Sequence, residues 1–345
     1  MTTSDELDEC LTRLSATGPE FDGGLSNHGP MAVEALTALG RPGEARPWLD
    51  RYITRLDEPP RGTFAVTEDN WPEALGAVKR VANWEDYFRA QLTEAAWQDV
   101  LARWWARLLP GAAGAATHGL IRTSHAARAL GAARTPEREA ELARGLAYWA
   151  ASYVELPGIL GGHGHLTLAD AIDGLPVAAR PADDGLITER VKTTLTTQPQ
   201  IRIAIGGLRP PADAAAALPA VAAAFAGMFL RYGRSRPIAL IHTVTAPTAA
   251  WSVVPLLPPE LARPTHDALW KVSAALGAVY ASGVAAEPLP AGSPPSLQDV
   301  VDRAVASGDE HAIKLTEACL RLAAASTAPD PTLLHAAARA SQLLR

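Results

Sequence analysis

The sequence predicts a mainly α-helical protein, built as one large domain over residues 1–345 from packed helix pairs, with little or no sheet. Two observations predict this fold class. Apolar residues recur at helical spacing along most of the chain, and proline and glycine stand where such segments would begin and end. Strand signals are few, and the hydrophobic fraction of 48% is that of an ordinary globular protein.

Eight segments carry the helical pattern, and several have recognisable ends. Pro30 and Pro136 suit first helical turns, and Thr117 is placed to cap a helix. Gly40 followed by Pro42 indicates a stop. Helices are therefore expected over residues 29–45, 94–109, 118–132, 136–156, 265–282, 296–308, 309–326 and 330–344.

Three further apolar segments have other readings. Residues 200–207 and 237–247 have the best strand signals, although the second reads equally well as a buried helix that ends before Pro247. Residues 212–230 approach the length of a membrane span. They are mostly alanine, which supplies little transfer free energy, and an aspartate and a proline interrupt them. We expect a tightly packed buried helix there, and no contact with a membrane.

Charge and cysteine content narrow the function classes. The net charge is −6, and no basic block or basic helix suggests a nucleic-acid or anionic-membrane partner. Cys10 and Cys319 are too few for a disulfide framework or a thiolate zinc site. The acidic N-terminus lacks the layout of a signal peptide. These observations predict a soluble, reduced protein of the cytoplasm.

Histidine is the residue type that suggests chemistry, because the familiar cofactor motifs are missing. The sequence has no dinucleotide-binding glycine motif, phosphate loop, nucleophile elbow or H-E-x-x-H pair. Four histidines stand in segments that look buried or tightly turned: His28, His118, His242 and His311. Imidazole binds iron, zinc, copper and nickel, so these four are candidate metal ligands. The alternative is that each is a hydrogen-bonded core residue or a helix cap.

The other histidines have simpler readings. His163 and His165 have chelate-like spacing, but the surrounding glycines suggest a surface loop first, a substrate gate second and a ligand third. His125, seven residues after the second candidate ligand, is read as a core residue or a partner of a ligand. His266 and His335 read as ordinary helix residues.

Several motifs together resemble the questin oxidase-like family. They span most of the chain, and they are SNHGPMAVEALTALGR at 26–41, PWLDRY at 47–52, NWPEALG at 70–76, THGLIR at 117–122, LIHTVTAP at 240–247 and HAIKLTEA at 311–318. Fungal members of that family cleave or oxygenate the rings of anthraquinone-type polyketides, and some have been described as Baeyer–Villiger-type oxidases. The resemblance implies a mostly helical oxygenase with a non-haem iron centre, held by histidines and a modified lysine, in place of a flavin.

Carried over residue by residue, the motifs assign the metal ligands. The NHGP motif corresponds to His28, the THGLI motif to His118 and the IHTV motif to His242, while HAIK corresponds to His311 and Lys314. Positions i and i+3 of a helix share a face, so the last two side chains can reach one metal ion. A protonated lysine has no lone pair for a metal, so the resemblance implies that Lys314 is carboxylated to a carbamate. Without the resemblance, a lysine whose ammonium reaches solvent is the simpler reading.

The expected reaction is oxidative carbon–carbon cleavage or Baeyer–Villiger-type oxygenation of a polycyclic, anthraquinone-like substrate by O2. Ferrous iron, Fe(2+), supplies the one-electron chemistry that dioxygen requires, and NADPH is a candidate external reductant. Arg122, one helical turn after a candidate ligand, is placed to orient a substrate phenolate, with a surface salt bridge as the alternative. Two other function classes stay open: a zinc-type metallohydrolase that uses the same histidines, and a non-catalytic helical binding protein.

Overall fold

A computed structural model describes residues 3–158, 164–176, 178, 185–281, 283, 285–327 and 330–345. Helices make up 71% of the structure and the sheet has only two strands, so the mainly α fold class is confirmed. By its internal contacts the chain divides into two compact units. The first unit comprises Met1–Glu155 and Ser252–Pro259, and the second comprises Leu156–Trp251 and Glu260–Arg345. That all 345 residues act as one domain stays a prediction.

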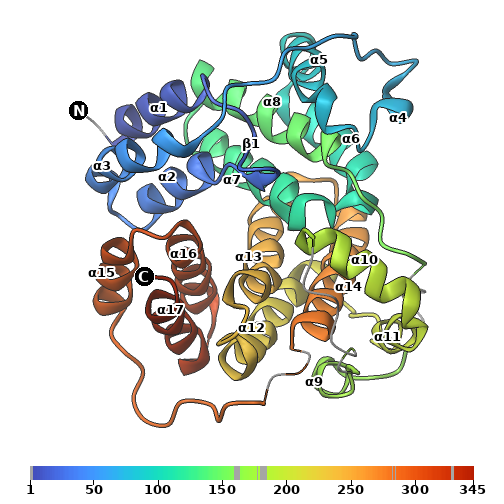
Figure 1. The fold of residues 1–345 in the computed structure, drawn as a ribbon, viewed down its shortest axis with the longest axis vertical. Coiled ribbons are helices and arrows are strands. Elements are labelled where there is room, and N and C mark those ends of the chain that lie inside the picture. The colour runs from blue at the N-terminus through green and yellow to red at the C-terminus, as the bar shows by residue number, and fades with distance from the viewer. Residues whose placement is uncertain are drawn as a thin grey trace. The chain divides into compact units, whose positions relative to one another are not determined.

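The first unit is an assembly of helices with one short hairpin (Figure 1). The hairpin pairs β1 (Glu20–Phe21) with β2 (Leu25–Ser26) in antiparallel register. The helices described in this unit are α1 (Thr3–Leu14), α2 (Gly29–Ala38), α3 (Pro42–Tyr52), α4 (Trp71–Ala74), α5 (Val81–Glu94), α6 (Trp97–Leu108), α7 (His118–Ala132) and α8 (Pro136–Ala151).

The predicted stop near residue 40 is confirmed. Gly40 has a φ of +73°, a left-handed conformation that glycine adopts without steric penalty. The next helix, α3, then begins at Pro42, whose fixed φ suits a first turn. The expected helix over 29–45 is therefore two helices, α2 and α3, which pack against each other.

The core of the first unit lies around the pair α7 and α8, which pack closely because two glycines stand at their contact. A Cβ on Gly119 would lie 2.4 Å from Trp149 Cα, and a Cβ on Gly145 would lie 2.9 Å from Thr123 Cα. No other residue fits such an approach without moving a backbone. Nearby, Trp84, Trp104 and Phe88 form a buried aromatic cluster.

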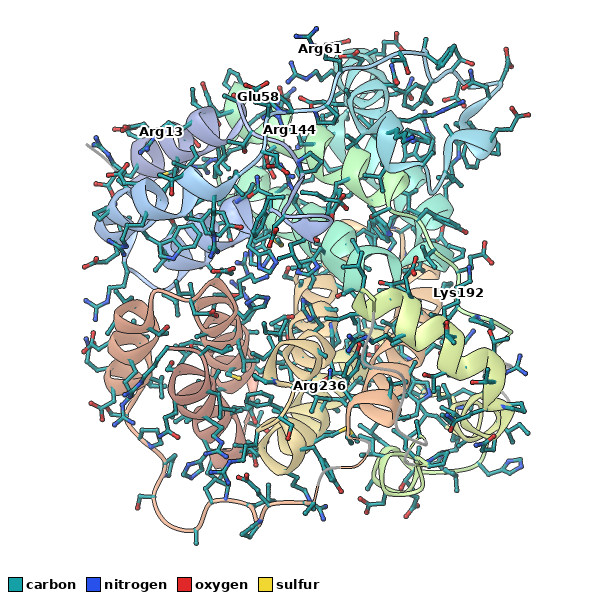
Figure 2. All side chains as sticks on the ribbon, viewed as in Figure 1. Arg13, Glu58, Arg61, Arg144, Lys192 and Arg236 are labelled. Carbon is teal, nitrogen blue, oxygen red and sulfur yellow. The ribbon has the colours of Figure 1, made fainter. Side chains whose placement is uncertain are left out.

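The second unit contains the remaining helices. They are α9 (Leu168–Asp173), α10 (Ile187–Thr197), α11 (Pro199–Ile205), α12 (Ala214–Tyr232), nearly all of α13 (Pro237–Val253), α14 (Ala262–Tyr280), α15 (Leu297–Ser307), α16 (Glu310–Ala325) and α17 (Pro331–Leu343). Helix α12 packs against α14 and α17, and α16 packs along α17 (Figure 1). Exposed charged side chains, such as Arg61 and Lys192, project away from the backbone (Figure 2).

The strand prediction for residues 200–207 is wrong, and of the two readings of residues 237–247 the buried helix is confirmed. Residues 200–207 largely form α11, which begins at Pro199 and buries Ile201 and Ile205 four residues apart. Residues 237–247 lie in α13, and that helix continues past Pro247 to Val253. Short apolar segments do not distinguish a strand from a buried helix, so packing against neighbours decided between them.

Pro247 is tolerated inside α13 because a neighbouring helix replaces the hydrogen bond that it removes. Proline has no N–H, so the carbonyl of Thr243, four residues earlier, loses its helical donor. The Ser273 hydroxyl on α14 donates to this carbonyl at 3.3 Å. The expected end of the helix before Pro247 assumed that no such donor is available.

Two helical segments are long and apolar enough, by length and composition alone, to cross a membrane. They are Ala214–Tyr232 and Pro237–Leu256, and 50% and 78% of their apolar windows are buried inside the structure. Core helices of proteins without a membrane span meet the same criterion. The alanine-rich segment is helical as expected, with Leu218, Phe225 and Phe229 fully buried.

Candidate metal-binding histidines

His28 stands at the start of α2, in a turn that the neighbouring residues hold in place. The Asn27 side chain accepts a hydrogen bond from Gly29 N at 2.9 Å and donates to Gly18 O at 2.8 Å. His28 N donates to the Tyr52 hydroxyl at 2.6 Å. The His28 ring makes no capping hydrogen bond to its own helix. Its nitrogens are therefore not committed to the helix end.

The glycine and the proline of the SNHGP motif have structural roles. A Cβ on Gly29 would lie 2.4 Å from Leu14 Cδ2, so a larger residue there would require the Leu14 side chain on α1 to move. Pro30 occupies the first turn of α2, where the missing N–H costs nothing. Ser26 bonds to the buried Tyr148 hydroxyl at 2.7 Å. Each residue of the motif thus helps to fix the position of the His28 backbone.

His118 begins α7 directly after a left-handed turn. Ala115, Ala116 and Thr117 all have positive φ, at 44°, 52° and 74°. Three consecutive non-glycine residues in this region are strained, because each Cβ crowds its own carbonyl. Thr117 occupies the predicted N-cap position of α7, but its hydroxyl makes no capping hydrogen bond.

The left-handed turn directs the His118 ring. His118 Nδ1 lies 2.5 Å from Ala115 O. A carbonyl can only accept, so in the neutral ring the hydrogen is assigned to Nδ1, and Nε2 keeps its lone pair. Metal-binding histidines usually have this arrangement, in which the second nitrogen donates to a carbonyl or a carboxylate. The observation favours His118 as a ligand through Nε2.

The strain in this turn leads to a stability prediction. Replacing Ala116 with glycine is expected to raise the free energy of unfolding by about 1 kcal/mol, because glycine adopts positive φ without penalty. Denaturant unfolding measures this difference. The control is Ala90→Gly on the exposed face of α5, where φ is helical and a loss of about 1 kcal/mol is expected. A loss at both positions would contradict the assigned strain.

Within the first unit, the structure brings His28 and His118 together. Their ring centroids lie 4.4 Å apart, with a 49° angle between the ring planes. Both side chains are buried, at 5% exposure. Residues 90 positions apart in the sequence therefore form a histidine pair at the adjacent ends of α2 and α7.

Within the second unit, His242 and His311 form another pair. Their ring centroids lie 5.8 Å apart and the ring planes are nearly perpendicular, at 85°. His242 comes from the middle of α13, and His311 comes from the first turn of α16. The Asp309 carboxylate caps α16 by accepting hydrogen bonds from His311 N at 2.8 Å and Ala312 N at 3.0 Å.

Lys314 lies one turn after His311 on α16 and is buried, at 2% exposure. Burial disfavours the ammonium and lowers the pKa of Lys314 to about 8, although the negative charges of Glu310 and Asp309 oppose this shift. A substantial fraction of this side chain is thus a neutral amine near pH 8. The simpler reading, in which the ammonium of Lys314 reaches solvent, is wrong for this structure.

Arg122 is buried and forms an ion pair with Glu141. Its Nε donates to Oε1 at 2.6 Å, and its Nη2 donates to Oε2 at 2.9 Å. Both partners are about 95% buried, so the contact is an internal ion pair and not the surface salt bridge of the alternative reading. That Arg122 orients a substrate stays a prediction.

Three further histidines belong to neither of these two histidine pairs. His163 falls outside the described residues, and His165 is exposed. His125 is buried and bonded through Nδ1 to Glu34 at 2.6 Å, which agrees with its reading as a core residue.

No protein-family model matches this chain, and no curated protein is significantly similar to it. The resemblance to the questin oxidase-like family therefore rests on the motifs alone.

The charged partners of His125 were not predicted from the sequence. Glu34 accepts hydrogen bonds from both His125 and Arg128. Burial by itself would raise the pKa of Glu34, but these two partners outweigh it and hold that pKa well below its usual value. No local signal pointed to Glu34 as the partner of His125, because 91 residues separate the two in the sequence.

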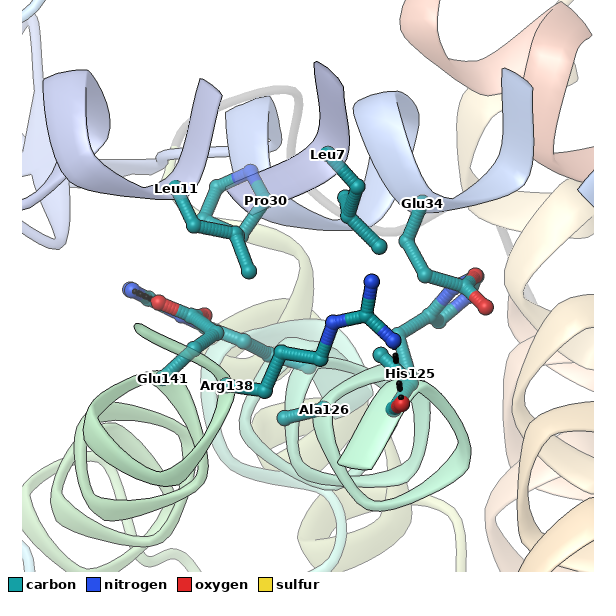
Figure 3. Close-up of a pocket in the computed structure, with 10 residues that line it drawn as sticks. Leu7, Leu11, Pro30, Glu34, His125, Ala126, Arg138 and Glu141 are labelled. Carbon is teal, nitrogen blue, oxygen red and sulfur yellow. Dashed lines mark hydrogen bonds and ion pairs between the residues drawn. The ribbon is translucent and has the colours of Figure 1, made fainter. Parts of the chain in front are cut away.

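Glu34 and His125 line a small cavity between α1, α2, α7 and α8 (Figure 3). Glu34, Arg138 and Glu141 supply charge to its wall, while Leu7 and Leu11 of α1 close it with apolar groups. Arg138 bonds to Asp8 at 2.7 Å and to Ala129 O at 3.0 Å. Two ion pairs at this cavity join neighbouring helices: His125 with Glu34 joins α7 to α2, and Arg122 with Glu141 joins α7 to α8.

Proposed function

We propose that this protein is a non-haem iron-dependent oxygenase that cleaves or oxygenates a polycyclic aromatic substrate of the anthraquinone type. Iron would be held by His28, His118, His242 and His311, together with Lys314. The observation that carries the proposal is the pairing of these histidines within each unit, at the helix positions that the motifs name.

The donor set suits ferrous iron. Imidazole nitrogen and anionic oxygen are both ligands that this metal accepts. The Ala115 carbonyl leaves Nε2 of His118 with its lone pair. The lowered pKa of Lys314 supplies a neutral amine, whose lone pair can add to the carbon of CO2. The amine nitrogen then loses a proton to solvent, and the resulting carbamate carries one negative charge.

Iron and the chain's own residues would have separate roles at the site. Iron, when bound, supplies a one-electron route to dioxygen that side chains lack. The burial of all four imidazoles excludes bulk water, which strengthens electrostatic interactions with an anionic substrate. The hydrogen bond from His118 to Ala115 fixes the ring orientation before a metal binds.

Iron binding tests the proposal first. Ferrous iron added under anaerobic conditions is expected to bind at one equivalent per chain and to raise the unfolding temperature. Each of the four histidine-to-alanine variants, and Lys314→Arg, is expected to lower iron affinity by more than about tenfold, because a ligand is lost or stays cationic. His165→Ala is the control and should retain iron. Two equivalents per chain would mean that each histidine pair binds its own ion.

Turnover tests the reaction. The iron-loaded protein should consume oxygen in the presence of a hydroxyanthraquinone or its reduced form, with and without NADPH, and mass spectrometry should find an oxygenated or ring-opened product. A protein that retains zinc, binds no iron and consumes no oxygen would support the hydrolase class instead. A protein that binds no metal at all would favour a binding role.

A further inference from the structure

A hollow in the second unit, remote in sequence from the metal-site motifs, is lined by basic and apolar residues. Two chain segments form it, the end of α11 with the following loop and the first turns of α14. The residues that matter for its chemistry are Arg209, Arg263, His266, Asp267, Trp270 and Lys271. Three cationic side chains thus surround one carboxylate and one imidazole.

The carboxylate in this hollow is already neutralised. Arg263 Nε donates to Asp267 Oδ1 and Oδ2 at 2.9 and 2.8 Å, and His266 Nδ1 lies 3.0 Å from Oδ1. Partial burial by itself would raise the pKa of Asp267, but the hydrogen bonds from His266 and Arg263 outweigh it and hold that pKa below its usual value. Asp267 is therefore ionised, and it accepts the hydrogen of His266 Nδ1.

Two positive charges remain. Among the described residues, neither Arg209 nor Lys271 has a carboxylate within ion-pair distance, although the chain has 37 acidic residues against 31 lysines and arginines. The N-terminus of α14, which has no side-chain cap, adds the positive end of a helix dipole beside Arg263.

The imidazole of His266 adds a hydrogen-bond acceptor with a fixed orientation. His266 is 2% exposed, so its orientation is fixed by packing and by the bond to Asp267. With the hydrogen on Nδ1, Nε2 has a lone pair and accepts a hydrogen bond. Trp270 forms an apolar wall, because its indole N–H is occupied by Ile205 O at 2.8 Å. A ligand here needs negative oxygens for the two cations and a hydroxyl for Nε2.

We propose that this hollow is a binding site for inorganic phosphate. Hydrogen phosphate carries negative oxygens that Arg209 and Lys271 can neutralise, and it carries a P–OH group that donates to His266 Nε2. Sulfate has the same shape and charge but lacks the hydroxyl at neutral pH. The site goes beyond the proposed oxygenase function and shares no residue with the two histidine pairs.

Calorimetric titration of the metal-free protein with sodium phosphate tests this site, at a constant ionic strength set with sodium chloride. Saturable binding at one equivalent is expected. The double variant Arg209→Gln/Lys271→Gln should bind phosphate at least about tenfold more weakly, a change of about 1.4 kcal/mol. The matched control is Lys192→Gln/Arg303→Gln, which removes the same charge from exposed positions of the same unit and should bind as the wild type does.

The outcomes separate a built site from a general charge effect. Equal weakening in both double variants, or no saturable binding by the wild type, would overturn the proposal. Sulfate binding as tight as phosphate binding would also overturn it, because the hydroxyl contact to His266 would then contribute nothing. The unfolding temperatures of both double variants in phosphate-free buffer should match the wild type, which excludes a folding defect as the cause.

Discussion

Replacing Arg122 with methionine is expected to lower the free energy of unfolding by about 3–5 kcal/mol. The change leaves the Glu141 carboxylate buried without the two hydrogen bonds that it now receives at 2.6 and 2.9 Å. An ionised group in that position loses its hydration and has no replacement for the guanidinium. Denaturant unfolding at neutral pH, with the change in midpoint at constant slope, measures the loss.

Two further variants identify the cause. The double variant Arg122→Met/Glu141→Leu removes both charges and is expected to recover most of the stability, since a buried ion pair and an apolar pair of similar volume are often nearly equal in stability. Arg134→Met breaks the exposed pair with Glu139 and should change stability by about 0.5 kcal/mol or less. A double variant as unstable as the single one would show that packing, and not the unpaired carboxylate, caused the loss. The double variant also removes any role of Arg122 in orienting a substrate, so its turnover tests that prediction.

Replacing Lys314 with methionine is expected to stabilise the metal-free protein at pH 7 by about 3 kcal/mol, the free energy that corresponds to a pKa of about 8 against the ordinary value of 10.5. The pKa is lower in the folded state, so the unfolded chain binds more protons between these two values. The destabilising effect of the buried Lys314 ammonium is therefore complete below about pH 8, and it disappears as the pH rises through 10.5.

The pH dependence provides the measurement. In buffer free of carbon dioxide, the stability difference between Lys314→Met and the wild type should be large at pH 7 and should shrink as the pH approaches 10.5, the ordinary lysine value. The control is Lys192→Met on an exposed position of α10, for which no such change is expected. A constant difference across this range would mean that the folded state does not disfavour the Lys314 ammonium. Stability without metal is thus expected to rise when the proposed ligand is removed, whereas iron binding should be lost.

Local signals in the sequence determined most of the helices. Pro136 predicted the start of α8, and Gly40 with Pro42 predicted the end of α2, because their backbone preferences act without help from distant residues. The candidate ligands were also named from the sequence, since each stands in a recognisable motif. A motif names a residue type at a position, and this information is local.

Tertiary structure decided the features that depend on distant partners. Pro247 lies inside α13 because Ser273 on another helix supplies the missing donor. Thr117 stands at the N-cap position of α7, but its left-handed backbone, with a φ of +74°, departs from the extended conformation in which an N-cap side chain usually bonds to its helix. The partners Glu34 of His125 and Glu141 of Arg122 were equally invisible, because 91 and 19 residues separate the two members of each pair. A single sequence reports the preferences of each segment, whereas these choices depend on which segments become neighbours after folding.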